Sequence, residues 1–342
     1  MEYPIKTLLI FTSFFLFYTS GIASAQDLSS VKNLQLKPKY RMAQIIRYNA
    51  DHFVMVVMNN PSVGENQSVV VINKDGQQVF FCSPQKDIPE ASSVSVHDAA
   101  VNKNGMVSVI VVAVSTTVQP VSVLMVYDLN SGKLQRLVQL APISAKSVAV
   151  DENNNTWIMG ADLVKKNSRR VDYDLIYKFS SEGKLLASYV ARSLFANNGF
   201  GPQDNEPFNR RKNSIDYPLL FANQAGKVFA WFAGQRTLVE LNGEGEILSK
   251  AQISEENLKG RFVTSVAIQP NGQVLALLPT GITRLVSGSN LWKPIAYEQS
   301  SEVTQMLKVN PTNSIFVIGA DSSSIIVRDS NNRIFWLPVT NQ

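Results

Sequence analysis

Apolar runs alternate with short polar segments along most of the chain. Val, Ile, Leu, Phe and Thr gather in runs of five to eight residues, each bounded by Asn, Asp, Gly or Ser. Examples are Phe53 to Met58, Val228 to Phe232 and Val274 to Leu278. Such bounded runs are typical of β-strands, and no convincing amphipathic helical spacing accompanies them. The pattern therefore predicts an all-β protein.

One unit of this pattern recurs: an apolar strand, a turn rich in Asn and Gly, and a second apolar strand. Its clear copies are AAVNKNGMVSVIVV from Ala99, SVAVDENNNTWIMG from Ser147, LLFANQAGKVFAWFAG from Leu219, SVAIQPNGQVLALLP from Ser265 and MLKVNPTNSIFVIGA from Met306. A diverged copy, QIIRYNADHFVMVVM, starts at Gln44. The turn centres lie near residues 51, 104, 154, 225, 272 and 313.

A second hairpin follows each copy. In four of these hairpins Gly76, Gly132, Gly183 and Gly245 stand where a tight turn needs a positive φ. Two hairpins per repeat give four strands, and four strands over about 40 to 50 residues are typical of a β-propeller blade. We therefore predict a six-bladed β-propeller with four antiparallel strands per blade. A pair of β-sandwiches with accidental periodicity is the alternative.

The predicted propeller is a single domain over residues 41–342, preceded by a segment at 26–40. Its blades are expected at about 41–82, 95–140, 144–190, 217–253, 261–297 and 302–340, with an insertion at 191–217. The segment at 26–40 does not look strand-like, which argues against a seventh blade.

The copies SVAVDENNNTWIMG and SVAIQPNGQVLALLP, together with IYKFSSEGKLLASYV, resemble NHL-type repeats. Those repeats run as a strand of small residues, Val and Ala, a turn of Asp-x-x-Gly type, an apolar strand and a Gly-Lys hairpin. The match is good in the third and fifth blades, loose in the second, fourth and sixth, and poor in the first. The resemblance implies a six-bladed propeller but no residue role, since such propellers include binding modules, scaffolds, and a few lyases and lactonases.

The first 25 residues have the features of a secretory signal peptide. Lys6 precedes the apolar run Thr7 to Tyr18, and Ala23-Ser24-Ala25 forms a small-x-small cleavage site. The apolar run is shorter than the roughly 20 residues that span a bilayer. We therefore expect cleavage rather than an uncleaved anchor, and a secreted or periplasmic protein that does not span a membrane afterwards.

Composition excludes several classes of protein. A chain that is 45% hydrophobic and 17% charged is not disordered as a whole. One Cys and two His supply neither a disulfide framework nor a usual zinc site, so no metal or cofactor is predicted. The lone Cys82 suits an oxidising compartment if it is buried. The net charge of +5 comes with no groove-reading motif, so nucleic acid is not an expected partner.

The two faces of the predicted ring differ in their connections. In a four-stranded meander, the turns after the first and third strands lie on one face, here called the turn face. The remaining connections lie on the opposite face, here called the loop face. The turn-face connections are short, whereas the longest loop-face connection is the insertion at 191–217. Binding residues concentrate in long loops on a rigid scaffold, although a self-packed Ω-loop is the alternative for this insertion.

Basic side chains cluster in two of the loops expected on the loop face. The candidate ligand-binding residues are Lys165, Lys166, Arg169 and Arg170 in the blade-three loop, and Arg192, Phe200, Phe208, Arg210, Arg211 and Lys212 in the insertion. Because these two loops of one blade are expected to be neighbours, the clusters form one patch that would attract an anionic polymer. A solvated basic surface without a ligand is the alternative.

A second candidate site is the mouth of the central channel, where the innermost strands begin. The residues expected there are His97, Asp98, Asp216, Arg261 and Glu302. His97 beside Asp98 resembles an acid–base pair, but adjacent strand residues point to opposite faces unless a bulge intervenes. An incidental histidine is therefore favoured.

The leading hypothesis is a monomeric, non-enzymatic binding or protein-interaction module. Its ligand, a protein or an anionic polymer, would bind the loop face near blades three and four. The alternative is a propeller hydrolase, lactonase or lyase with converging carboxylates at the channel mouth.

Overall fold

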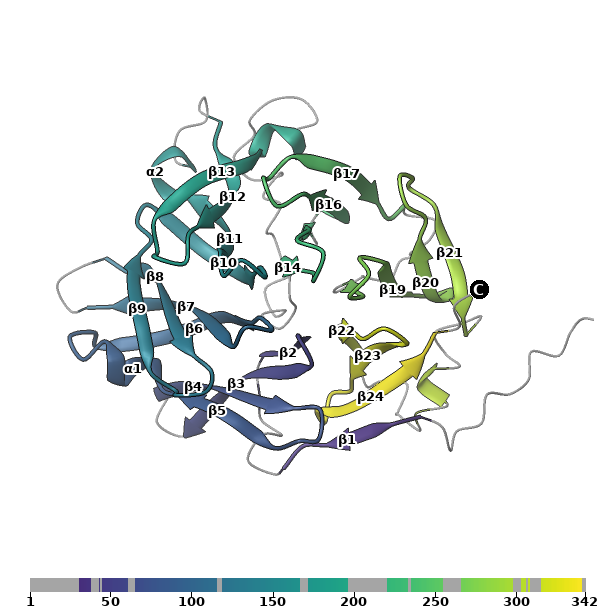
Figure 1. The fold of residues 1–342 in the computed structure, drawn as a ribbon, viewed down its shortest axis with the longest axis horizontal. Coiled ribbons are helices and arrows are strands. Elements are labelled where there is room, and N and C mark those ends of the chain that lie inside the picture. The colour runs from purple at the N-terminus through teal and green to yellow at the C-terminus, as the bar shows by residue number, and fades with distance from the viewer. Residues whose placement is uncertain are drawn as a thin grey trace, which may run out of the picture.

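The computed structural model describes residues 31–37, 43, 45–60, 65–115, 119–166, 172–195, 220–232, 235–254, 266–297, 303–305, 307 and 315–339. In these ranges, six antiparallel sheets of four strands each stand side by side around a central axis (Figure 1). The chain is therefore a six-bladed β-propeller, and the predicted fold class is confirmed. No helix in the same ranges has the length and apolar character needed to cross a membrane.

The first three blades each use four consecutive strands, ordered from the axis outward. Blade one contains β2 (Ile45–Asn49), β3 (His52–Asn60), β4 (Glu65–Asn73) and β5 (Gln78–Cys82). Blade two contains β6 (Ser93–Val101), β7 (Met106–Val114), β8 (Val121–Asp128) and β9 (Leu134–Gln139). Blade three contains β10 (Ile143–Val150), β11 (Thr156–Asp162), β12 (Asp174–Phe179) and β13 (Leu185–Ala191).

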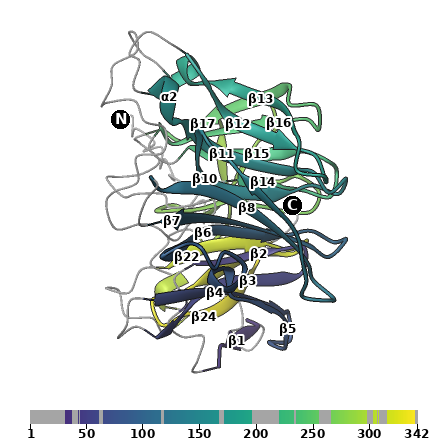
Figure 2. The same cartoon turned by 90° about the vertical axis from the view of Figure 1, so that its left-hand side faces the viewer.

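The next two blades follow the same order. Blade four contains β14 (Leu220–Ala222), β15 (Val228–Phe232), β16 (Thr237–Leu241) and β17 (Ile247–Gln252). Blade five contains β18 (Ala267–Ile268), β19 (Val274–Leu278), β20 (Gly281–Leu285) and β21 (Trp292–Ala296). Short helices lie in the described connections, among them α1 (Pro84–Asp87), α2 (Leu163–Lys166) and η3 (Arg192–Phe195). Figure 2 views the ring from its side, with α2 at the loop face.

Blade six is built from both ends of the described chain. Its strands are β22 (Phe316–Ala320), β23 (Ser324–Arg328), β24 (Arg333–Pro338) and, outermost, β1 (Asn33–Gln35). β1 pairs with β24 in antiparallel fashion and so closes the ring. The sequence indicates β22 as the second strand of its blade, but it is the innermost, because β1 fills the fourth place. The segment at 26–40 thus supplies a strand, although its sequence does not look strand-like.

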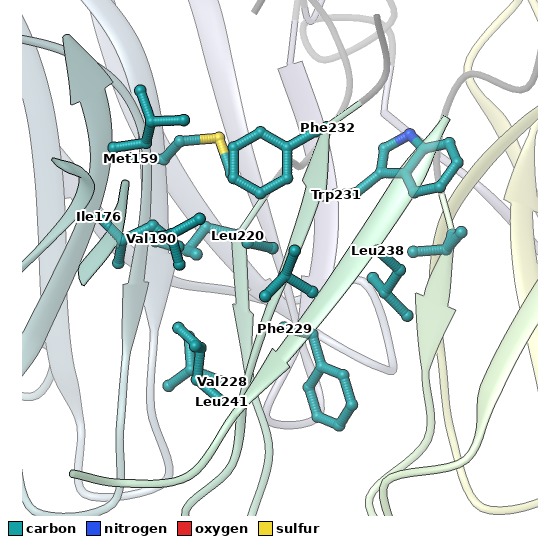
Figure 3. Packing of buried hydrophobic residues seen from close by; sticks show 14 of the residues in the cluster. Met159, Ile176, Val190, Leu220, Val228, Phe229, Trp231, Phe232, Leu238 and Leu241 are labelled. Atoms are coloured by element: carbon teal, nitrogen blue, oxygen red, sulfur yellow. The ribbon is translucent and has the colours of Figure 1, made fainter. Parts of the chain in front are cut away.

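The apolar core is divided into layers between neighbouring blades. Every residue of β11 and of β15 is buried, whereas the outermost strand β9 alternates between half-buried and exposed positions. Figure 3 shows both faces of β15 in blade four: Phe232 lies on one side of the strand with Met159, and Phe229 and Trp231 lie on the other. Stacked blades cover both faces of the inner strands, which is why continuous apolar runs mark them in the sequence.

The predicted hairpin glycines have the expected backbone conformation. Gly76, Gly132, Gly183 and Gly245 have φ values of +79°, +69°, +81° and +89°. At Gly245 the space is also restricted, since a Cβ there would lie 2.1 Å from the ring of Tyr189. Glycine is required at this turn for both reasons.

Candidate functional site at the axis and the loop face

Arg47 of β2 lies across the axis of the ring. Its side chain is buried, with the whole residue 2% exposed. The guanidinium donates hydrogen bonds to the main-chain carbonyls of Ala99 (3.3 Å), Val148 and Leu220 (2.8 Å). These carbonyls belong to the innermost strands of blades two and three and of blade four. One side chain of blade one therefore joins four of the six blades.

Asp98 of β6 is the counter-ion of this guanidinium. Its Oδ2 lies 3.6 Å from Arg47 Nη2, and both side chains are buried. Oδ2 also accepts hydrogen bonds from Ser147 Oγ (2.6 Å) and from the Val148 amide (3.0 Å), while Oδ1 accepts one from the Ala99 amide. Burial lowers the pKa of Arg47, and the charge of Asp98 opposes that shift. The carboxylate is thus held as a structural ion-pair partner.

His97 and Asp98 do not point to opposite faces, because a β-bulge lies between Val96 and Asp98. A bulge places two residues of one strand opposite a single residue of its partner. His97 Nδ1 lies 3.1 Å from the Ala145 carbonyl, so both side chains contact β10. The printed partners of the Asp98 carboxylate are Arg47, Ser147 and two main-chain amides, so it serves as the counter-ion of the arginine. The other predicted mouth residues, Asp216, Arg261 and Glu302, lie outside the described residues.

Six equivalent polar residues stand at the end of the innermost strands, on the turn face. We call them the turn-start residues, because each begins the turn to the second strand: Asn49, Asn102, Asp151, Asn223, Gln269 and Asp321. Three of their carboxamides donate to a main-chain carbonyl of the next blade. The pairs are Asn49 Nδ2 to Val101 (2.7 Å), Asn102 Nδ2 to Asp151 (2.9 Å) and Gln269 Nε2 to Asp321 (3.0 Å).

Turn-start side chains also hold their own turns. Asp151 Oδ1 accepts hydrogen bonds from the amides of Asn153 (2.9 Å) and Asn155 (2.8 Å), and its Oδ2 accepts one from Trp157 Nε1 (2.9 Å). The Asn-rich segment after Asp151 is therefore turn chemistry rather than a cation loop. Among the residues that the structure describes, no group of three or more His, Cys, Asp or Glu could hold a metal ion.

Four of the turn-start residues, Asn49, Asn102, Asn223 and Gln269, line a depression of about 50 Å³ at the axis. Residues of all six blades line it, and its apolar wall includes Val150, Phe221 and Ile268. Two buried polar atoms of lining residues, Asn223 Nδ2 and Gln269 Oε1, have no hydrogen-bond partner. Sequence reasoning missed this site because it expected function on the other face. The available signal was an Asn, Asp or Gln at the same place in successive repeats.

The basic patch predicted for the loop face is described only at its edges. Arg169, Arg170, Phe200, Phe208, Arg210, Arg211 and Lys212 lie outside the described residues, and of Lys165 and Lys166 only the backbone, in α2, is described. Arg192 was expected to contact a ligand, but it is 5% exposed. Its guanidinium stacks over the Tyr173 ring at 5.5 Å, so its role here is packing.

The described ends of the two basic loops are hydrogen-bonded to each other. The Arg192 amide donates to the Tyr173 carbonyl (2.9 Å), and the Ser193 amide donates to Asp172 Oδ1 (3.1 Å). The residue at which the insertion departs, Phe195, packs on Phe232 of blade four with ring centroids 4.4 Å apart. The two basic segments therefore start from neighbouring points, as the blade arrangement predicts.

No protein-family model matches the sequence, and no curated protein matches it. Among solved structures, the chain is similar to virginiamycin B lyase from Staphylococcus aureus, with 11% identity over 91% of this chain and 99% of that one and a TM-score of 0.45. It is also similar to the WD40 β-propeller domain of Doa1, with 12% identity, 92% and 98% coverage, and a TM-score of 0.45. A third similar structure is the glutaminyl cyclase of Myxococcus xanthus, with 14% identity, 74% and 93% coverage, and a TM-score of 0.34. Similarity at this level transfers no activity or binding residue to this chain.

Proposed function

We propose that the protein is an exported, non-enzymatic binding module whose ligand contacts the loop face at blades three and four. The observation that carries the proposal is the junction of the two basic loops. Arg192 and Ser193, which begin the insertion, are hydrogen-bonded to Tyr173 and Asp172, which end the blade-three loop. Two long segments that start from one point on a rigid blade can present a joint surface.

The axis supports binding rather than catalysis as the role of the ring. A hydrolase or lyase at the channel mouth would need a carboxylate free to exchange a proton or to hold a cation. Asp98, the described candidate, is an ion-pair partner of Arg47 and accepts three further hydrogen bonds. Its buried network makes the ring a scaffold.

The ligand that fits the basic segments is an anionic polymer or an acidic protein surface. Arg169, Arg170, Arg210 and Arg211 belong to the two segments, so clustered guanidinium groups would attract negative charge. Exposed apolar side chains stand at the start of the blade-three loop, with Val164 72% and Leu163 45% exposed. Apolar contact beside a basic cluster suits a folded partner as well as a polymer.

Charge reversal tests this proposal. Changing Arg169, Arg170, Arg210 and Arg211 to Glu should make the protein elute from a sulfated-polysaccharide column at clearly lower salt, because exposed charges act through screened attraction. The matched control reverses four exposed lysines elsewhere, namely Lys37, Lys133, Lys184 and Lys293. Equal shifts in both variants would indicate a net-charge effect, and an unchanged elution of the arginine variant would contradict an anionic ligand at this face.

A further inference from the structure

Buried polar atoms without partners gather in blades four and five. Five such atoms belong to these two blades: Asn223 Nδ2 and Trp231 Nε1 in blade four, and Gln269 Oε1, Trp292 Nε1 and Tyr297 Oη in blade five. The described residues of blades one to three contain no such atom. Buried polar groups are nearly always hydrogen-bonded in folded proteins, so this junction requires an explanation. Two of the atoms, those of Asn223 and Gln269, belong to residues that line the axial depression.

Asn223 departs from the pattern of the other turn-start carboxamides. Asn102 and Gln269 each donate to the carbonyl of the next blade's turn-start residue. Asn223 Oδ1 accepts hydrogen bonds from the amides of Ala225 (3.0 Å) and Lys227 (2.9 Å), which fixes the orientation of the carboxamide. Its Nδ2 group is then left without an acceptor, although Asn223 is only 6% exposed.

The unpaired donor and the unpaired acceptor lie at the same turn. Asn223 Nδ2 packs against the blade-five turn, since a Cβ added to Gly272 would lie 3.0 Å from it. Gln269 begins that turn and is 1% exposed. The depression beside them, of about 50 Å³, exceeds the roughly 10–15 Å³ that a water molecule needs. It has room for a small group that carries both an acceptor and a donor.

We propose that this depression binds the amide group of a neutral ligand. The amide carbonyl would accept a hydrogen bond from Asn223 Nδ2, and the amide N–H would donate one to Gln269 Oε1. The wall is apolar at Phe221 and Ile268, where an ionic group would lose its hydration, and the charged residue among those that line it, Glu152, would repel an anion. This site lies on the turn face, so its test is independent of the test of the loop-face proposal.

The probe is acetamide. Its binding is followed by NMR, through the side-chain amide signals of protein labelled with ¹⁵N at Asn and Gln. Acetamide should shift the Asn223 Nδ2 signal saturably, whereas acetate, which has the same shape and a charge, should not. Asn223→Asp keeps the oxygen that caps the turn and removes the donor, and Asp151 and Asp321 show that the fold accepts Asp at a turn start. Acetamide should bind this variant about tenfold more weakly. Binding to the variant is measured from the shift of the Gln269 side-chain amide signal.

The control is Asn242→Asp, which makes the same change at a turn carboxamide outside the depression, where Oδ1 accepts hydrogen bonds from the Glu244 and Glu246 amides and Nδ2 is already bonded to Glu246 Oε2. It should lose stability but bind acetamide as the wild type does. A peptide with one glutamine, titrated in the same way, separates a side-chain amide of a protein partner from a free small amide. The proposal is overturned if acetamide gives no saturable shift, which would leave the depression a water site, or if Asn223→Asp binds acetamide unchanged.

Discussion

Arg47 makes more polar contacts between blades than its place in the sequence suggests. The segment QIIRYN places it in an ordinary strand of the most diverged repeat. The three carbonyls that it reaches belong to other blades, with Leu220 separated from it by 173 residues. Those partners are set by closure of the ring and not by any local pattern. The sequence therefore indicated the strand but not the role of its arginine.

Removing the Arg47 guanidinium should strongly destabilise the fold. Arg47→Met leaves Asp98 buried without its cation and three carbonyls without their donor, which typically costs about 3–5 kcal/mol of unfolding free energy. Urea denaturation measures this loss. Arg136→Met, on the outermost strand β9, is the control and should change stability by less than about 0.5 kcal/mol.

The double variant Arg47→Met/Asp98→Asn separates charge from packing. If the unpaired carboxylate causes most of the loss, neutralising it should restore part of the stability. An Arg47→Met protein that is as stable as the wild type would contradict the structural role of the guanidinium.

At the scale of elements, tight hairpins were the most predictable feature. Gly76 and Gly245 marked turns from the sequence alone, because few other residues adopt a positive φ without strain. The composition of blade six was not predictable in this way. β1 has only three residues, Asn33–Gln35, too few for their alternation of polar and apolar positions to identify a strand, and its partner β24 lies at the other end of the chain. Short strands of this kind are defined by their partner rather than by their own sequence.

The segment that contains β1 should contribute measurably to stability. Leu36 is 3% exposed and packs in the same cluster as Phe53 and Trp336. Leu36→Ala should therefore reduce the unfolding free energy by about 2–5 kcal/mol, which thermal or urea unfolding would detect. The neighbouring change Lys37→Ala, at an exposed position, serves as the control. Equal stability of the two variants would show that the segment does not hold the ring closed.

At the scale of the whole molecule, the two faces of the ring differ in the polar groups that they present. The turn face carries carboxamides and an axial depression that the structure describes in detail, whereas the described ends of the two basic segments lie at the loop face. The sequence indicated the loop face through long connections and clustered charge. The recurring Asn, Asp or Gln was present in the repeats, but its place beside an axial depression depends on how the blades align around the axis.

The lone cysteine is buried and poorly reactive. Cys82 is 6% exposed, and burial raises the pKa of its thiol to about 12. Because that pKa is raised, the thiolate needed for disulfide exchange is scarce throughout the neutral range and increases only as the pH approaches 12. A thiol of this kind survives in an oxidising compartment without a partner.

Export and signal-peptide cleavage can be tested by measuring the intact mass of the protein. If the signal peptide is cleaved after Ala25, protein recovered from the periplasmic or extracellular fraction should begin at Gln26, and intact-mass spectrometry would show this. The change Ala25→Arg should block cleavage at the small-residue site and retain the precursor mass. A full-length mass for the wild-type protein in that fraction would contradict cleavage.

The pairing of β1 with β24 also constrains the order in which the ring folds. Asn33 lies opposite Phe335, so the last blade cannot be completed until almost the entire chain has been synthesised or translocated. Contacts between such distant residues have a high entropic cost of loop closure, and topologies rich in them fold slowly. The early blades must therefore persist as an open arc, with an apolar sheet face uncovered at each end, until the two ends meet. For this ring, the final step of folding and the covering of these two faces are the same event.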